Sequence, residues 1–411
     1  MLRPRLLKTL ALPVLSLVAA ACSHHVEEVD SSESALLPNS AVFEVGHDGT
    51  TYRLIAEAFA SRGLDMHVDT SVFAPEWPLV DTKTTALNRF GTPILFADYG
   101  YYHTGLAVMR TDSSVGTEVV APHDGLALVF DWSGNRISEV TNPYGTIVAI
   151  YDPVSHVVTQ LMHVAALGSL VSATEPVQVT KGDVIGKLAP APLPTPGDAS
   201  RLANTSVVFV DGENKKLLNP AALIEGYHDS VAPEAFGVYP TDGTGQVLAE
   251  LASGQLDIVV QAADRDDDSN RNFEVAAIGF TIKDQDGNVL SSNAKCALDD
   301  LYDSIANASS FRARELVDFG SAASQVSGAW PNSDVDNPNR IFRYAITNLS
   351  TENGRCVALD DESSFLEVGD AVTKLDISIT LWDAKGNEST KSFEIVRPAP
   401  EPPAPPPAPE E

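Results

Sequence analysis

Basic residues are scarce in this sequence, and so are the motifs of nucleotide chemistry. Only 27 lysine and arginine residues accompany 56 aspartate and glutamate residues, which gives a formal net charge of −29. A surface of this sign repels nucleic acid and anionic lipid headgroups, so we expect no nucleic-acid partner. The sequence also lacks a phosphate-binding loop, a dinucleotide fingerprint, a Ser-His-Asp order and a long internal repeat.

Long apolar runs are missing too, except for one at the N-terminus. It extends from residue 10 to 21, follows a basic start, and is too short to remain as a membrane-spanning helix. Three alanines precede Cys22, an arrangement that resembles a bacterial lipobox. We therefore expect residues 1–21 to be a lipoprotein signal peptide and Cys22 to be lipidated, with an ordinary signal peptide as the alternative. Several acyl chains on one residue anchor a protein stably. Ser23 favours the outer membrane, so the expected location is the bacterial cell envelope, lipid-anchored and facing the periplasm.

Cysteine is rare, with three residues in the whole chain. If Cys22 carries lipid, Cys296 and Cys356 remain as an even pair in an oxidising compartment, which predicts a disulfide. The loop that it closes has about 60 residues and contributes about 4 kcal/mol in the chain-entropy model. Two buried thiols are the alternative.

The remaining chain divides by composition and by hydrophobic pattern. After a polar tether and a lead-in with a predicted helix from Tyr52 to Ser61, short Val/Ile/Leu-rich segments bounded by glycine, proline, asparagine and aspartate predict strands almost throughout. Turn signals at 284–288 and 383–387 make the last folded unit look like an immunoglobulin-like module. The expected divisions are a tether at 22–40, a lead-in at 41–85, all-β units at 86–227 and 229–396, and a proline-rich tail at 397–411.

One series of motifs in 86–227 carries functional information. In order, it comprises His103-Thr-Gly-Leu-Ala107, Gly116-Thr-Glu-Val-Val-Ala121, Tyr144-Gly-Thr-Ile-Val148, Leu161-Met-His163, Gly182-Asp-Val-Ile-Gly186 and Ser206-Val-Val-Phe209. In order and spacing, these motifs resemble those of the LytM/lysostaphin-type peptidoglycan metalloendopeptidases. The resemblance implies an all-β fold, with a LytM-type antiparallel β-sandwich and an open groove, followed by the immunoglobulin-like β-sandwich.

The same resemblance shows which ligand positions have changed. The family binds zinc through the His and Asp of the first motif and the second His of the last. Here His103 survives, but Ala107 replaces the Asp, and Ser206 and Val208 replace the final histidines. A catalytic zinc usually needs three protein ligands, so the resemblance implies that His103 is a vestigial metal ligand.

The remaining catalytic histidine of the family corresponds to His163, also vestigial, and the tyrosine beside it to Leu161. By resemblance, the binding groove is bordered by His103, Leu161, His163 and Phe209. Residues 189–197 carry alternating prolines where active relatives have a Gly/Ser loop, and this stiff segment either covers or lines the groove.

Three functions remain open. The first is a catalytically degenerate envelope lipoprotein that needs no cofactor and binds peptidoglycan or regulates a cell-wall hydrolase, as degenerate family members do. The second is a zinc metalloendopeptidase with rearranged ligands, in which His103 and His163 bind zinc together with a carboxylate or His123. Asp124, next to His123, and His156, further along the chain, are the other candidate substitute ligands. The third is a structural surface lipoprotein.

Residues 264–270 are rich in aspartate but do not form an EF-hand, because the twelfth position is Val275 or Ala277. An irregular calcium loop and a solvated turn both remain open there.

Overall fold

The computed structural model describes residues 50–79, 84–89, 93–96, 99–110, 114–190, 203–242, 246–267, 272–298, 341–358 and 365–398. The predicted signal peptide, Cys22 and the tether lie outside the described residues, as do most of the 189–197 segment, residues 268–270 and the tail from 399.

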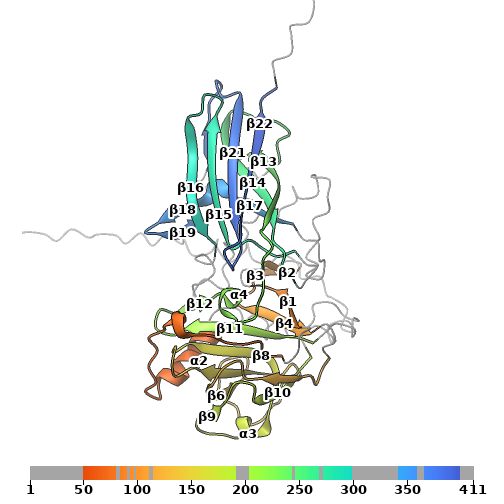
Figure 1. Cartoon of the computed structure of the whole chain (residues 1–411), viewed down its shortest axis with the longest axis vertical. Helices are drawn as coiled ribbons and strands as arrows, with labels where there is room; N and C mark the ends of the chain where they lie inside the picture. The colour runs from red at the N-terminus through yellow and green to blue at the C-terminus, as the bar shows by residue number, and fades with distance from the viewer. Residues whose placement is uncertain are drawn as a thin grey trace, which may run out of the picture.

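Ten of the strands between residues 84 and 218 form one large sheet (Figure 1). Its order is β1-β4-β11-β8-β7-β6-β9; β10 pairs with β5 and β8, β12 pairs with β11, and each pairing is antiparallel. The bounds are β1 (Thr84–Asn88), β4 (Leu106–Arg110), β5 (Glu118–Val120), β6 (Gly125–Phe130), β7 (Thr146–Tyr151), β8 (Val158–Ala166), β9 (Val177–Val179), β10 (Val184–Leu188), β11 (Thr205–Asp211) and β12 (Lys216–Leu218).

Both faces of this sheet are buried, which explains the continuous apolar runs of its central strands. Every residue of β7 and β11 is buried. Side chains of alternate residues enter two different cores: Val207 and Phe209 one, Val208 and Val210 the other. The sequence of a strand covered on both faces is a continuous run of β-branched and apolar residues, without alternation of apolar and polar residues.

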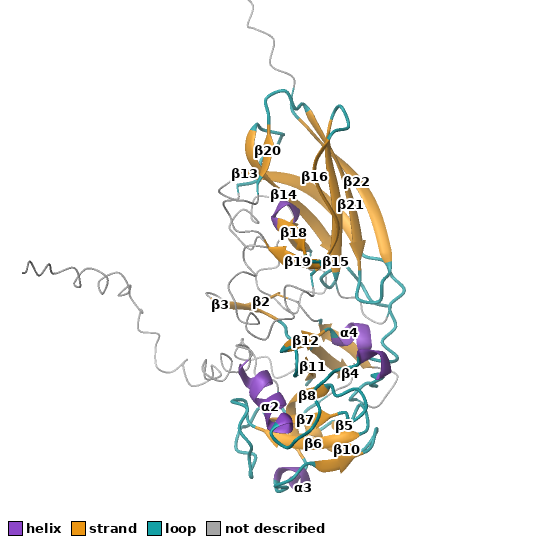
Figure 2. Ribbon diagram, turned by 90° about the vertical axis from the view of Figure 1, so that its left-hand side faces the viewer, coloured by secondary structure: helices purple, strands orange, loops and turns teal. Residues whose placement is uncertain are grey.

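Helix α2 (Thr50–Ala60) covers one of these faces (Figure 2). Its buried residues Tyr52, Ile55, Ala56 and Phe59 follow a helical period, and they share a core with Val208 of the sheet. This confirms the predicted helix. The expected groove on this face is therefore not open beside Val208, because the lead-in segment fills it.

Eight of the strands between residues 234 and 396 form two further sheets that share a core (Figure 1). In β21, every second residue is buried, as expected for a strand with one face on a core. One sheet contains β13 (Glu234–Asp242), β14 (Gly254–Ala263), β17 (Phe342–Ala345) and β20 (Leu366–Val368); the other has the order β16 (Val289–Ala297), β15 (Ala277–Asp284), β21 (Lys374–Trp382) and β22 (Glu388–Val396).

Short elements complete the described chain. They are the hairpins β2 (Pro93–Phe96) with β3 (Tyr99–Tyr102) and β18 (Leu349–Glu352) with β19 (Arg355–Ala358), the helices α3 (Gly168–Val171) and α4 (Pro220–Leu223), and the 3-10 turns η1 (Thr70–Val72) and η3 (Ile346–Asn348). The prediction of an all-β protein with antiparallel sheets is confirmed. Within the described residues, no helix has the length and apolarity to cross a membrane.

The predicted pairing of Cys296 with Cys356 is confirmed. The bond joins β16 to β19 with a Cα–Cα distance of 4.7 Å, and it closes a loop between residues 60 positions apart. Both cysteines are buried in the core that the two further sheets share. We call these two sheets the second group of sheets, and the large sheet of residues 84–218 the first.

Removing this disulfide should destabilise the protein. We expect the double variant Cys296→Ala/Cys356→Ala to lose about 3 to 4 kcal/mol of unfolding free energy, because its unfolded chain regains the freedom of the closed loop. Urea unfolding of the oxidised wild type and the variant measures the loss. Equal midpoints would show that the bond does not constrain the unfolded chain.

Candidate functional site

His103 and Ser206 meet at the edge of the α2-covered face. His103 precedes β4, and its Nδ1 lies 2.7 Å from the carbonyl oxygen of Gly105. Since a carbonyl only accepts, Nδ1 carries the proton in a neutral ring, and Nε2 accepts from Ser206 Oγ at 3.3 Å. His103 is 8% exposed and Ser206 7%, so the pair offers little surface to a substrate.

The other two family ligand positions lie beside this pair but supply no ligand atom. Ala107 is the cross-strand partner of Ser206, so the motifs converge in space as the sequence resemblance implies. Val208 is fully buried under α2. Tyr52 of α2 reaches the same place, where its hydroxyl contacts Thr104 Oγ1.

His163 is held in a strained position on β8. Its φ of 60° lies in the left-handed region, which is uncommon for residues other than glycine. The ring packs against Trp132, with 4.7 Å between ring centroids. Its Nδ1 is buried and makes no hydrogen bond among the described residues. The pKa of His163 is lowered to about 4, chiefly by burial and also by the nearby His103, while a hydrogen bond to the main chain of Tyr144 offsets part of the effect, so the ring is neutral at pH 7.

The left-handed residue also changes which neighbours face the site. Met162 belongs to the core under α2, whereas Leu161 and Val164 belong to the opposite core. Leu161 and Phe209, which we expected to border a groove, are fully buried in that opposite core. Of the four expected groove residues, the structure brings only His103 and His163 together.

The substitute ligands proposed from sequence are engaged elsewhere. His123 is buried, with Nδ1 2.8 Å from the Asp124 carbonyl oxygen and Nε2 2.7 Å from Thr159 Oγ1. Burial lowers the pKa of His123. The Asp124 carboxylate accepts from the main-chain N–H of Lys181 at 2.7 Å. His156 lies parallel to the ring of Tyr151.

The residues around His103 therefore do not fit a zinc ion. Among the residues that the structure describes, neither His103 nor His163 belongs to a group of three His, Cys, Asp or Glu side chains within metal-binding range. A zinc site needs three such protein ligands. We derive no metal-dependent step from this site.

A second polar cluster lies where the two groups of sheets meet, and the sequence did not predict it. Arg89 follows β1, and its guanidinium donates to Asp264 after β14 and to Asp229 at 3.0 Å. It also lies 3.7 Å from Asp266 and 4.1 Å from the ring centroid of Phe273. These charged side chains are at most 3% exposed. The aspartate-rich run at 264–270 was the available signal, but nothing in the sequence pointed to a buried arginine partner.

Burial dominates the titration of these carboxylates. It raises the pKa of Asp264 to about 7 and that of Asp229 to about 6, and the positive charge of Arg89 offsets only part of the effect. Tyr227 Oη donates to Asp266 at 3.0 Å.

The comparisons with known proteins place this chain in no family. No protein-family model matches it, and no curated protein does. A solved structure, the NMR solution structure of lysostaphin, is similar to 55% of this chain over 81% of its own length, with 13% sequence identity and a TM-score of 0.28. A likeness at that level decides neither the fold nor the function.

The half-buried, neutral His163 should make the protein sensitive to acid. Its pKa is lower in the folded than in the unfolded state, so its contribution is complete above about pH 6.5 and declines as pH falls toward 4. We expect the variant His163→Asn, whose side chain tolerates a left-handed backbone, to gain about 2 to 3 kcal/mol relative to wild type between pH 6.5 and 4.

Urea unfolding at a series of pH values measures this difference. His156→Asn is the matched control, because His156 also has a left-handed backbone, with φ 63°. A constant difference between wild type and His163→Asn across this pH range would contradict the prediction.

Loss of Arg89 should destabilise the junction strongly. We expect Arg89→Ala to lower the unfolding free energy by about 3 to 5 kcal/mol at pH 8, because it leaves buried carboxylates without their counter-ion. Arg53→Ala is the control, since Arg53 forms an exposed pair with Glu57 within α2. Equal unfolding midpoints for the two variants would contradict this assignment.

Proposed function

We propose that this chain is a non-catalytic, lipid-anchored protein of the bacterial cell envelope that binds peptidoglycan or a cell-wall hydrolase and thereby regulates peptidoglycan remodelling. The proposal rests on one observation. His103, Ala107 and Ser206 lie close together, with His163 near His103, and α2 covers the face of the sheet that a substrate would need. The positions that resemble a peptidase site are thus gathered without its ligands.

The partner would meet this site at its edge. His163 keeps part of its surface exposed, and the main-chain carbonyl of Tyr144 faces its ring. The loop before Tyr144, which joins β6 to β7, is exposed over residues 138–141. This loop and His163 form the surface that we assign to the partner, and we call it the His163 rim.

The function is tested by sedimentation with purified sacculi. We expect the purified protein to pellet with them, or to change the rate of a cell-wall hydrolase, without releasing peptides itself. Glu139→Lys and His163→Ala should weaken the effect at least fivefold, because both alter the His163 rim. The variant His156→Ala is the control, since His156 packs on Tyr151 instead.

Metal analysis separates the alternatives. About one tightly bound zinc per chain together with cleavage of sacculi would replace the proposal with the metalloendopeptidase. Absence of pelleting and of any effect on hydrolases would favour the structural surface lipoprotein.

A further inference from the structure

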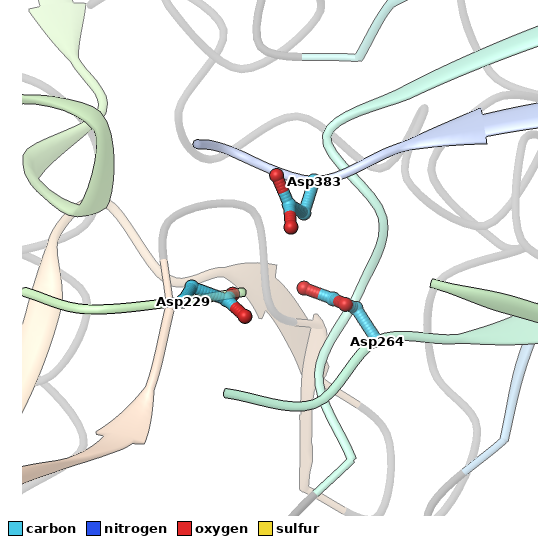
Figure 3. Close-up of side chains that lie close together, drawn as sticks. All are labelled: Asp229, Asp264 and Asp383. Atoms are coloured by element: carbon cyan, nitrogen blue, oxygen red, sulfur yellow. The ribbon is translucent and has the colours of Figure 1, made fainter. Parts of the chain in front are cut away.

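Three carboxylates from distant parts of the chain converge beside Arg89 (Figure 3). Asp229 lies between α4 and β13, Asp264 follows β14, and Asp383 begins the turn between β21 and β22. Each offers one oxygen, and the three oxygens lie within 4.8 Å of one another. Like charges this close repel unless something positive lies among them.

One oxygen in this cluster lacks a partner. Asp264 is 1% exposed, and its Oδ2 accepts from Arg89. Its Oδ1 is buried, and no described residue donates a hydrogen bond to it. Figure 3 shows the Asp264 carboxyl group turned toward those of Asp229 and Asp383. A buried carboxylate oxygen without a donor is costly, so this atom points to a ligand that the side chains do not supply.

The charges at the junction do not balance. Four described carboxylates gather there, Asp229, Asp264, Asp266 and Asp383, together with the cations Arg89 and Lys385. Lys385 directs its ammonium to the carbonyl oxygens of Ala222 and Ile224, at 3.4 and 3.3 Å. With all six groups ionised, two negative charges remain, which is the charge that one divalent cation supplies.

The donor set selects the kind of cation. It contains only oxygen atoms, which hard cations prefer, and neither histidine nor cysteine, which zinc prefers. Calcium accepts six to eight oxygens in flexible geometry and completes its shell with water, whereas magnesium demands a near-ideal octahedron. An open hollow lined by Ile224, Tyr227, Asp229 and Lys385 lies beside the cluster.

We propose that Asp229, Asp264 and Asp383 bind one calcium ion at the junction of the two groups of sheets. The ion lies beside Asp264 Oδ1, the oxygen that does not accept from Arg89. It links the segment after α4 to β14 and to the β21–β22 turn, so that calcium and Arg89 together hold the two groups of sheets. Among the described residues 264–267 of the aspartate-rich run, Asp264 alone belongs to this ligand group.

The chain contains a matched control for this site. Asp383 Oδ1 accepts from the main-chain N–H groups of Lys385 and Asn387, each at 2.8 Å. Asp284 makes the same turn, accepting from Asp286 and Asn288 at 2.9 and 2.8 Å, but it does not belong to the carboxylate group. Asp383→Asn and Asp284→Asn therefore disturb equivalent turns, and only the first changes the proposed site.

Calcium titration of the EDTA-treated full chain, followed by calorimetry, tests the proposal. We expect one calcium per chain, binding at least tenfold weaker in Asp264→Asn and Asp383→Asn, and binding within twofold of wild type in Asp284→Asn. Calcium should also raise the melting temperature of wild type and of Asp284→Asn, but not that of Asp264→Asn. The Asp264→Asn variant keeps the test decisive even if the Asp383 variant folds poorly.

Three results would overturn it: no heat and no melting shift at 10 mM calcium, equal binding by all variants, or binding of zinc in place of calcium. None of these measurements involves peptidoglycan, so the outcome is independent of the proposed function.

Discussion

The buried guanidinium of Arg89 determines how the two groups of sheets meet. A charge removed from water needs partners close by, and Arg89 finds them in Asp264 and Asp266 after β14 and in Asp229 in the segment that connects the two groups. Phe273 and Tyr227 lie against the faces of the guanidinium, at 4.1 and 5.5 Å from its carbon. Because Arg89 follows a strand of the large sheet while Asp264 and Asp266 follow β14 of the other group of sheets, these ion pairs link the two groups.

The candidate peptidase-like site depends on a different constraint, the coverage of both faces of the large sheet. Helix α2 occupies the face that carries Val208, and Gln160 donates to the carbonyl of Tyr52 at 3.2 Å, which fastens the helix to β8. His163 reaches the edge of this face only because its left-handed backbone interrupts the alternation of β8. The packing of α2 and this irregularity of β8 therefore decide what remains accessible near His103.

Much of the fold could be predicted because its signals are local. The helix at α2, the strands β7, β14 and β21, and the hairpin turns follow from hydrophobic period and turn residues. The meeting of His103 with Ser206 followed from the resemblance of their motifs to those of a known family. The interior position of Leu161 did not, because the left-handed backbone at His163 interrupts the alternation of β8 and has no signal in the sequence. Nor did the Arg89 cluster, whose members are separated by up to 294 positions in the chain, from Arg89 to Asp383.

Three turns show why local sequence alone does not locate a site. Asp131, Asp284 and Asp383 each begin an Asp-x-x-Gly-Asn turn and accept main-chain N–H bonds at 2.8 to 2.9 Å. Only Asp383 then faces two further carboxylates. The same five-residue pattern stabilises a tight turn in each case, and only the third turn lies among further carboxylates that need a positive charge. The carboxylate cluster at this junction therefore depends on where the tertiary fold places Asp383. The turn sequence itself accounts only for the main-chain hydrogen bonds that Asp383 accepts.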